Sequence, residues 1–94
     1  MVSGSDLKVA VIGLGYIGLP TAAVIARTGV EVLGIDVSDH VVETVNSGKI
    51  HIEEVDLDGL VQAVVQRGML KASTTFALIR FLGERMVNAK RIPI

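Results

Sequence analysis

The chain has 94 residues, a formal net charge of −1 and no cysteine, and half of its residues are hydrophobic. This length allows one small domain with a modest core, and the lack of cysteine excludes a disulfide framework and a thiolate metal site. The balanced charge gives no general attraction to nucleic acid or to acidic membranes.

The first predicted elements lie in a stretch without charge, VAVIGLGYIGLPTAAVIA (9–26). The β-branched run Val9–Ile12 suits a buried strand, and Ile17–Thr28 suits a helix that ends before Gly29. Pro20 fits only if the helix begins close to Tyr16, because proline is tolerated in a first helical turn. The length also suits a membrane span or a secretory signal. Glycines, a proline and the amphipathic elements that follow favour a strand and a helix instead.

The rest of the chain continues this alternation of strands and helices. A second strand at Glu31–Ile35 ends at Asp36, and a third is predicted at Leu70–Thr74. Two helices are predicted between them: one capped by Ser38 that runs through Ser47 to a stop at Gly48, and, after a loop at 49–55, one capped by Asp56 and ended by Gly68. The order predicts an α/β fold. More specifically, we expect a partial Rossmann (doubly wound) fold, with a three-stranded parallel sheet in order 3-2-1 and helices on both faces.

Gly13, Gly15 and Gly18 form a G-x-G-x-x-G pattern directly after the first strand and at the start of a helix. In that position the pattern is typical of a dinucleotide-binding turn. Gly13 permits the tight turn, where a Cβ would clash, Gly15 lets the backbone approach a pyrophosphate, and Gly18 lets the helix pack against the strand. The N–H groups near Tyr16 and Ile17 would then face the anion. A glycine-rich turn without a ligand is the alternative.

Asp36 selects the cofactor in this interpretation. It ends the second strand, where a carboxylate can accept hydrogen bonds from an adenosine ribose and repel a 2′-phosphate, and no Lys or Arg follows before Lys49. NAD is therefore predicted over NADP, with FAD as a minor rival because flavoproteins share the pattern. A capping or loop aspartate is the other interpretation. The predicted cofactor-binding residues are Gly13, Leu14, Gly15, Tyr16, Ile17, Gly18 and Asp36.

The stretches VIGLGYIGLPTAA, GIDVSDHVVETVNSGKIHIEEVDLDGLV and GMLKASTT together resemble the amino-terminal part of the UDP-glucose/GDP-mannose dehydrogenase family. Within that family, the chain is most similar to the branch that acts on UDP-N-acetyl-D-mannosamine. The resemblance covers about residues 7–75 and implies the NAD-binding portion of an oxidoreductase of polysaccharide biosynthesis. Such enzymes oxidise a nucleotide-sugar 6-hydroxyl twice, with two NAD. Two positions depart from the family pattern: Val41 replaces a basic residue and Val55 a proline.

The resemblance also implies what this chain cannot do. Relatives are several times longer and use a cysteine nucleophile for a thioester step, which needs a thiolate. We therefore expect a truncated NAD-binding domain at 1–75 that is inactive alone, with no catalytic residue. A non-catalytic nucleotide-binding or interaction module is the alternative. A complete small dehydrogenase of another type is less favoured because no general base is visible.

Other candidate side chains are assigned to the surface. His40 and His51 are predicted to face solvent, and the pair Glu53–Glu54 lacks nearby ligands for a metal, so no metal site is predicted. Residues 76–94 form a divergent, basic tail that is predicted to be an amphipathic helix with Leu78, Leu82 and Met86 on one stripe. That helix could cover the core, touch a membrane surface or arise from a shifted reading frame.

The expected partners follow from these assignments. NAD is the predicted ligand, and a UDP-sugar would bind only if the missing domain is supplied. No nucleic-acid partner and no membrane span are expected. The expected location is the cytoplasm. Self-association is expected because the first strand would have an unpaired edge.

Overall fold

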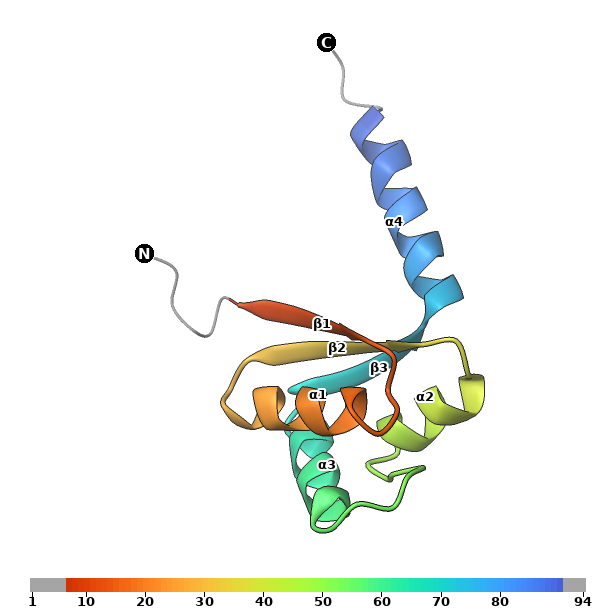
Figure 1. The fold of residues 1–94 in the computed structure, drawn as a ribbon. Helices are drawn as coiled ribbons and strands as arrows, with labels where there is room; N and C mark the ends of the chain where they lie inside the picture. The colour runs from red at the N-terminus through yellow and green to blue at the C-terminus, as the bar shows by residue number, and fades with distance from the viewer. Residues whose placement is uncertain (1–6, 91–94) are drawn as a thin grey trace.

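Three short parallel strands form the sheet at the centre of the protein (Figure 1). The computed structural model describes residues 7–90. The elements, in chain order, are β1 (Lys8–Ile12), α1 (Gly18–Arg27), β2 (Glu31–Asp36), α2 (Asp39–Asn46), α3 (Leu57–Gln66), β3 (Leu70–Thr74) and α4 (Thr75–Lys90). Each predicted strand and helix is present, with bounds within two residues of the prediction at both ends of every strand.

The strand order is β1-β2-β3, so β2 lies in the middle and pairs in parallel with both neighbours. The predicted order 3-2-1 is thus confirmed. The register sets Ile12 opposite Ile35, and Asp36 opposite Thr74. All three carboxyl ends therefore meet at one edge of the sheet, where ligands of open α/β sheets bind.

Helices α1, α2 and α3 lie together on one face of the sheet, below it in Figure 1. Both crossovers advance in the same direction along the sheet, and right-handed crossovers then place their helices on the same side. Of the described elements, α4 alone lies on the other side; it contacts β3 and β2 near its start and extends away from the sheet. The predicted helices on both faces are therefore unequally distributed, and no described element covers most of the second face.

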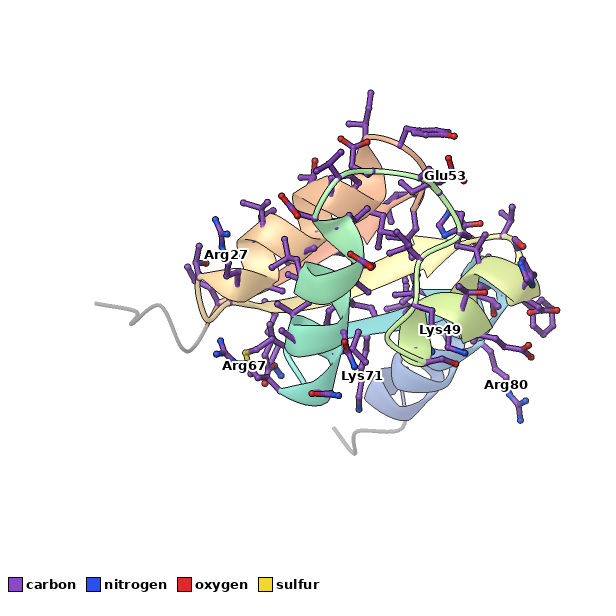
Figure 2. All side chains as sticks on the ribbon, turned by 90° about the horizontal axis from the view of Figure 1, so that it is seen from below. Arg27, Lys49, Glu53, Arg67, Lys71 and Arg80 are labelled. Atoms are coloured by element: carbon purple, nitrogen blue, oxygen red, sulfur yellow. The ribbon has the colours of Figure 1, made fainter. Side chains whose placement is uncertain are left out.

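The core fills the space between the sheet and α1–α3 and consists of aliphatic side chains. Alanines Ala22, Ala23 and Ala26 allow α1 to lie close to β2 and α3, against Val61 and Val64. None of the described polar or charged residues is buried, and Figure 2 shows Arg27, Arg67 and Arg80 at the outline of the molecule. Among the described residues no helix is long and apolar enough to cross a membrane. The uncharged stretch instead folds into β1 and α1.

The helix ends agree with the sequence in all but one case. The hydroxyl of Ser38 accepts a hydrogen bond from the Val41 N–H (3.2 Å) and caps α2, as predicted. Asp56 precedes α3, but the prediction that its side chain caps the helix is wrong. Its backbone is left-handed (φ +64°) and its carboxylate caps no N–H; Asp58 accepts from the Gly59 N–H instead (2.8 Å).

The predicted helical tail is α4, which begins at Thr75 directly after β3. Leu78 is half-buried and Leu82 is half-exposed, whereas Phe76 and Ile79 are strongly exposed. The side chain of Met86, the third member of the predicted stripe, and residues 91–94 lie outside the described part. The apolar surface of this helix is thus only partly used against the sheet.

Candidate cofactor site

The glycine loop connects β1 to α1 at the carboxyl edge of the sheet. The Gly13 N–H donates to the Ile35 carbonyl (2.7 Å), which fixes the start of the loop against β2. Gly13 has φ +88°, a conformation that favours glycine. A Cβ there would meet no atom within 4 Å. The need for glycine is therefore conformational, and the predicted steric clash at Gly13 is wrong.

Gly18 and Gly15 differ in what surrounds them. A Cβ on Gly18 would overlap the Gly13 carbonyl oxygen, lie 2.8 Å from the Gly13 carbonyl carbon and reach 3.6 Å from Val11 Cγ1. Only glycine lets α1 begin this close to the end of β1, as predicted. A Cβ on Gly15 would meet nothing within 4 Å. The space beside it is free for a ligand that approaches the backbone.

The first turn of α1 presents N–H groups that no described protein atom accepts. The Leu19 N–H bonds to the Gly15 carbonyl and the Thr21 N–H to the Ile17 carbonyl, while Pro20 has no N–H. Protein acceptors are absent, within the described residues, for the N–H groups of Gly15, Tyr16, Ile17 and Gly18. Such groups at a helix start attract an anion.

An open groove of about 550 Å³ runs along this turn. Its walls are the end of β1, the glycine loop and Thr21 on α1. The side chains of Tyr16 and Ile17 are mostly exposed, but that of Leu14 is fully buried against Gly34 of β2. Leu14 thus anchors the loop against β2, while Tyr16 and Ile17 line the groove on the exposed side of the loop.

Asp36 lies beside the same loop. One carboxylate oxygen accepts from the Leu14 N–H (2.9 Å) and the other from the Ser38 N–H (3.0 Å). The bond from Leu14 and then the bond from Ser38 lower the pKa of Asp36, with smaller help from the His51 charge, against the opposing effect of burial. The carboxylate is therefore ionised at neutral pH. It has lone pairs left for a ligand.

The sequence did not indicate a second groove, of about 490 Å³, at the ends of β2 and β3. Val37 and Phe76 contribute exposed apolar surface to it, and Thr74 and Thr75 contribute hydroxyl groups. Asp36 accepts a hydrogen bond from the glycine loop and directly precedes Val37, which lines this groove. The sequence feature that could have pointed to it is an apolar residue, Val37, directly after the acid.

Both histidines were predicted to face solvent. The prediction is confirmed for His40, which is exposed, and wrong for His51. His51 is half-buried, and its Nδ1 is buried without a described hydrogen-bond partner. Its neighbours Ile50 and Ile52 pack on or in the core and hold this loop against the protein. The inward-facing isoleucines on both sides were the signal that the loop is packed.

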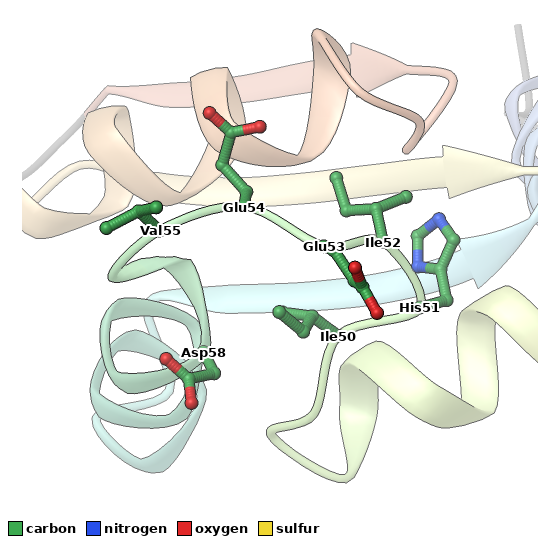
Figure 3. Close-up of a pocket in the computed structure, with 7 residues that line it drawn as sticks. All are labelled: Ile50, His51, Ile52, Glu53, Glu54, Val55 and Asp58. Carbon is green, nitrogen blue, oxygen red and sulfur yellow. The ribbon is translucent and has the colours of Figure 1, made fainter.

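A hollow of about 650 Å³ lies along the loop between α2 and α3 (Figure 3). Its carboxylates come from Glu53, Glu54 and Asp58 and point in different directions in Figure 3. No group of three metal-ligating side chains occurs among the described residues. The hollow therefore offers open surface but no converging ligands.

Residues 7–80 match the family model "UDP-glucose/GDP-mannose dehydrogenase family, NAD binding domain". The chain belongs to this family. The match identifies NAD as the cofactor of the domain, and it reaches a few residues further than the predicted limit near residue 75, into α4. The glycine loop and Asp36 both lie within it.

Named relatives agree with this assignment. The chain is 56% identical over 66 residues to the NDP-N-acetyl-D-galactosaminuronic acid dehydrogenase of Ralstonia nicotianae, covering 70% of this chain and 16% of the relative. It is 57% identical over 67 residues to the UDP-N-acetyl-D-mannosamine dehydrogenase of Campylobacter jejuni, covering 71% and 16%. The structure of the UDP-D-ManNAc dehydrogenase from Pyrococcus horikoshii aligns with a TM-score of 0.70 and 43% identity, over 72% of this chain and 16% of that one. The chain therefore spans about a sixth of its relatives' length.

Proposed function

We propose that the glycine loop binds the pyrophosphate of NAD and that Asp36 binds the adenosine ribose. The observation that supports this proposal most is that the N–H groups of residues 15–18 have no acceptor among the described residues. They lie on the loop that is itself hydrogen-bonded, through the Leu14 N–H, to the ionised carboxylate of Asp36. Gly13, Gly18 and the buried Leu14 shape the loop, while Gly15, Tyr16 and Ile17 offer backbone to the phosphates. The groove at the ends of β2 and β3, where Val37 and Phe76 are exposed, suits the adenine ring.

The same geometry supports a preference for NAD over NADP. An ionised Asp36 accepts hydrogen bonds from ribose hydroxyls but repels a 2′-phosphate. The sequence has no Lys or Arg between Asp36 and Lys49 that could neutralise such a phosphate. We therefore expect selectivity as well as binding to depend on Asp36.

Calorimetry on the wild-type chain and on Asp36→Ala tests this function. Loss of ribose hydrogen bonds to a charged group should weaken NAD binding about tenfold or more, and discrimination against NADP should relax. Asp58→Ala, an exposed carboxylate on α3, is the matched control and should bind NAD as the wild type does. Equal binding of NAD and NADP by the wild type would contradict the role of Asp36.

We further propose that the domain serves an enzyme that oxidises a nucleotide sugar such as UDP-N-acetyl-D-mannosamine, in the cytoplasm. Relatives named for that reaction support the substrate class. When bound, NAD supplies the hydride acceptor; the residues of this chain hold and orient it. The 94 residues contain no cysteine, so we expect the sugar to be bound and oxidised only when a catalytic domain is supplied. NADH formation by the purified chain with NAD and UDP-N-acetylmannosamine would contradict this division.

Finally, we propose that the isolated chain associates with itself through β1. This strand lies at one end of the sheet, so no described strand pairs with its outer side. The face beside it carries the exposed Ala10 and Ile12, and Lys8 at the start of the strand is paired with Glu31 of β2 (3.6 Å). Unpaired N–H and C=O groups on an apolar edge strand favour pairing with another chain.

A further inference from the structure

The start of α4 presents two large apolar side chains that lie outside the core. Phe76 is 78% exposed and Ile79 is 62% exposed. The two positions are three residues apart, so they lie on the same side of the helix. Both line the groove of about 490 Å³ at the ends of β2 and β3. Single exposed apolar side chains are common on protein surfaces, whereas apolar side chains gathered in one groove mark a binding site.

The lining of this groove comes from two segments that are distant in the sequence. Val37 and Asp39 belong to the segment that follows β2, and the other lining residues belong to the end of β3 and the start of α4. Asp36 and Thr74 are paired in the sheet register, so the two segments leave neighbouring strands at the same level. Figure 1 shows α4 starting beside the end of β2. A flat ligand in the groove would therefore meet Val37, which is 85% exposed, and Phe76.

The groove begins directly beyond the carboxylate that we assign to the adenosine ribose, because Val37 follows Asp36 in the chain. In a dinucleotide the base is joined directly to its ribose, so a base whose ribose is held at Asp36 must lie within one sugar's length of that carboxylate. Among the described residues that line the groove, only Asp39 is charged. Its carboxylate disfavours a phosphate there. A neutral aromatic base is the part of the cofactor that fits this lining.

We propose that α4 is a cofactor-binding element, in which Phe76 stacks on the adenine ring of NAD and Ile79 extends the same apolar wall. The inference rests on the proposed binding of the ribose by Asp36. Stacking removes the exposed ring of Phe76 and one face of the adenine from water, which stabilises the complex. The contact does not involve the ribose 2′ position. It therefore contributes equally to the binding of NAD and NADP, in contrast to the contact with Asp36.

Calorimetry with NAD and NADP on the wild type and on Phe76→Ala tests this inference. Loss of the stacked ring should weaken NAD binding about tenfold and leave the preference for NAD over NADP unchanged. The variant should fold, because Phe76 is exposed and alanine favours a helix. Phe76→Tyr keeps an aromatic ring and should bind NAD as the wild type does. Val55→Ala, at an apolar side chain that is 88% exposed on the α2–α3 loop, is the matched control and should also bind normally.

The outcomes of this experiment separate the inference from the proposed function. Unchanged NAD affinity in Phe76→Ala would overturn the inference and leave the binding of NAD by the glycine loop and Asp36 standing. If Phe76→Ala lowers self-association and not NAD affinity, the groove is occupied by a second copy of the chain, and the inference is overturned as well.

A direct probe of the contact does not depend on NAD binding. Proton NMR of the chain with AMP should show nuclear Overhauser effects between the adenine ring protons and the Phe76 ring, whose signals are identified by their loss in Phe76→Ala. The absence of these effects would overturn the inference whether or not NAD binds. Their presence in a chain that does not bind NAD would support the adenine contact at α4 and refute the proposed function alone.

Discussion

Asp36 has a structural task besides the one proposed for it at the ribose. Its two oxygens hold the Leu14 N–H of the glycine loop and the Ser38 N–H before α2. The alternative interpretation, a loop aspartate, thus describes part of what the residue does. Both tasks need the ionised form, since a carboxylate accepts at both oxygens and a neutral acid does so less well.

This dual task predicts a pH-dependent cost for Asp36→Asn. At neutral pH the variant should lose about 1 kcal/mol or more of unfolding free energy, because one amide N–H₂ group would face a backbone N–H. The folded state lowers the pKa of Asp36, so its contribution is present above the ordinary value of 3.8 and is lost as pH falls through the folded value. Urea unfolding of both proteins should therefore show a difference that shrinks in acid. A difference that stays constant across pH would contradict this account.

Gly18 is the residue of the loop that tolerates substitution least. Gly18→Ala forces a Cβ into the Gly13 carbonyl group, so α1 must move away from β1. We expect a loss of about 1–3 kcal/mol of stability and a loss of NAD binding. Gly59→Ala in α3, where a Cβ meets nothing within 4 Å, is the matched control and should stabilise the helix by about 0.5–1 kcal/mol. Thermal unfolding measures the stability of both variants. Equal melting temperatures for Gly18→Ala and Gly59→Ala would show that the close contact between Gly18 and Gly13 does not limit substitution.

At the scale of single residues, the sequence predicted where the special residues lie more reliably than it predicted why each residue is needed there. The glycine spacing located the turn, but the positive φ of Gly13 depends on the path of the chain between β1 and β2. Asp56 has the residue type of a helix cap, yet its left-handed backbone directs the carboxylate away from the first turn. The half-buried place of His51 depends on a loop packed by tertiary contacts, which no local pattern specifies.

The outer edge of β3 is covered by a side chain instead of a strand. The Asn46 amide at the end of α2 donates to the Ala72 carbonyl (2.9 Å) and accepts from the Ala72 N–H (2.8 Å). This pair of bonds reproduces what a neighbouring strand would supply. It also ties α2 to β3 across 26 residues of sequence.

Removing this amide should therefore destabilise the α2–β3 contact specifically. Asn46→Ala leaves one N–H and one carbonyl of β3 without these partners, at a cost of about 1–3 kcal/mol. Ser47→Ala, one residue on, loses only an exposed hydrogen bond to the Glu43 carbonyl within α2 and is the matched control. Hydrogen exchange at the Ala72 amide should accelerate in Asn46→Ala but not in Ser47→Ala. Unchanged protection at Ala72 would contradict the assignment.

Elements as such could be predicted from the sequence because their local signals agree. Apolar strands, a capping serine before α2 and glycines at the helix ends all point to the same boundaries. The Asn46 contact could not be predicted, since an asparagine in a last helical turn is common and its partner lies on a distant strand. The sequence could predict that α4 is helical. It could not predict which side of the sheet α4 contacts, because the apolar stripe of this helix is weak.

For the whole molecule, the two edges and the two faces of the sheet are unequally covered. The core lies on one face only, against α1–α3, and the β3 edge is occupied by Asn46. The β1 edge has no such partner among the described residues, and the contacts of α4 lie mainly at β3 and β2. The strand order 3-2-1 was predicted from the mononucleotide-binding pattern, and the right-handed rule, applied to both crossovers together, explains why α1–α3 lie on one face.

This asymmetry predicts that association uses β1 and the face beside it. Ile12, 72% exposed at the end of β1, lies on that face. Ile12→Lys should weaken association about tenfold or more, because a lysine on an edge strand opposes pairing and two copies would bring like charges together. Val24→Lys, on the exposed side of α1 and 46% exposed, adds the same charge away from the sheet and is the matched control. Sedimentation velocity at several concentrations should show the wild type and Val24→Lys shifting to larger species together, with Ile12→Lys remaining monomeric. A wild-type chain that sediments as a monomer at every concentration would mean that the β1 edge is protected in solution.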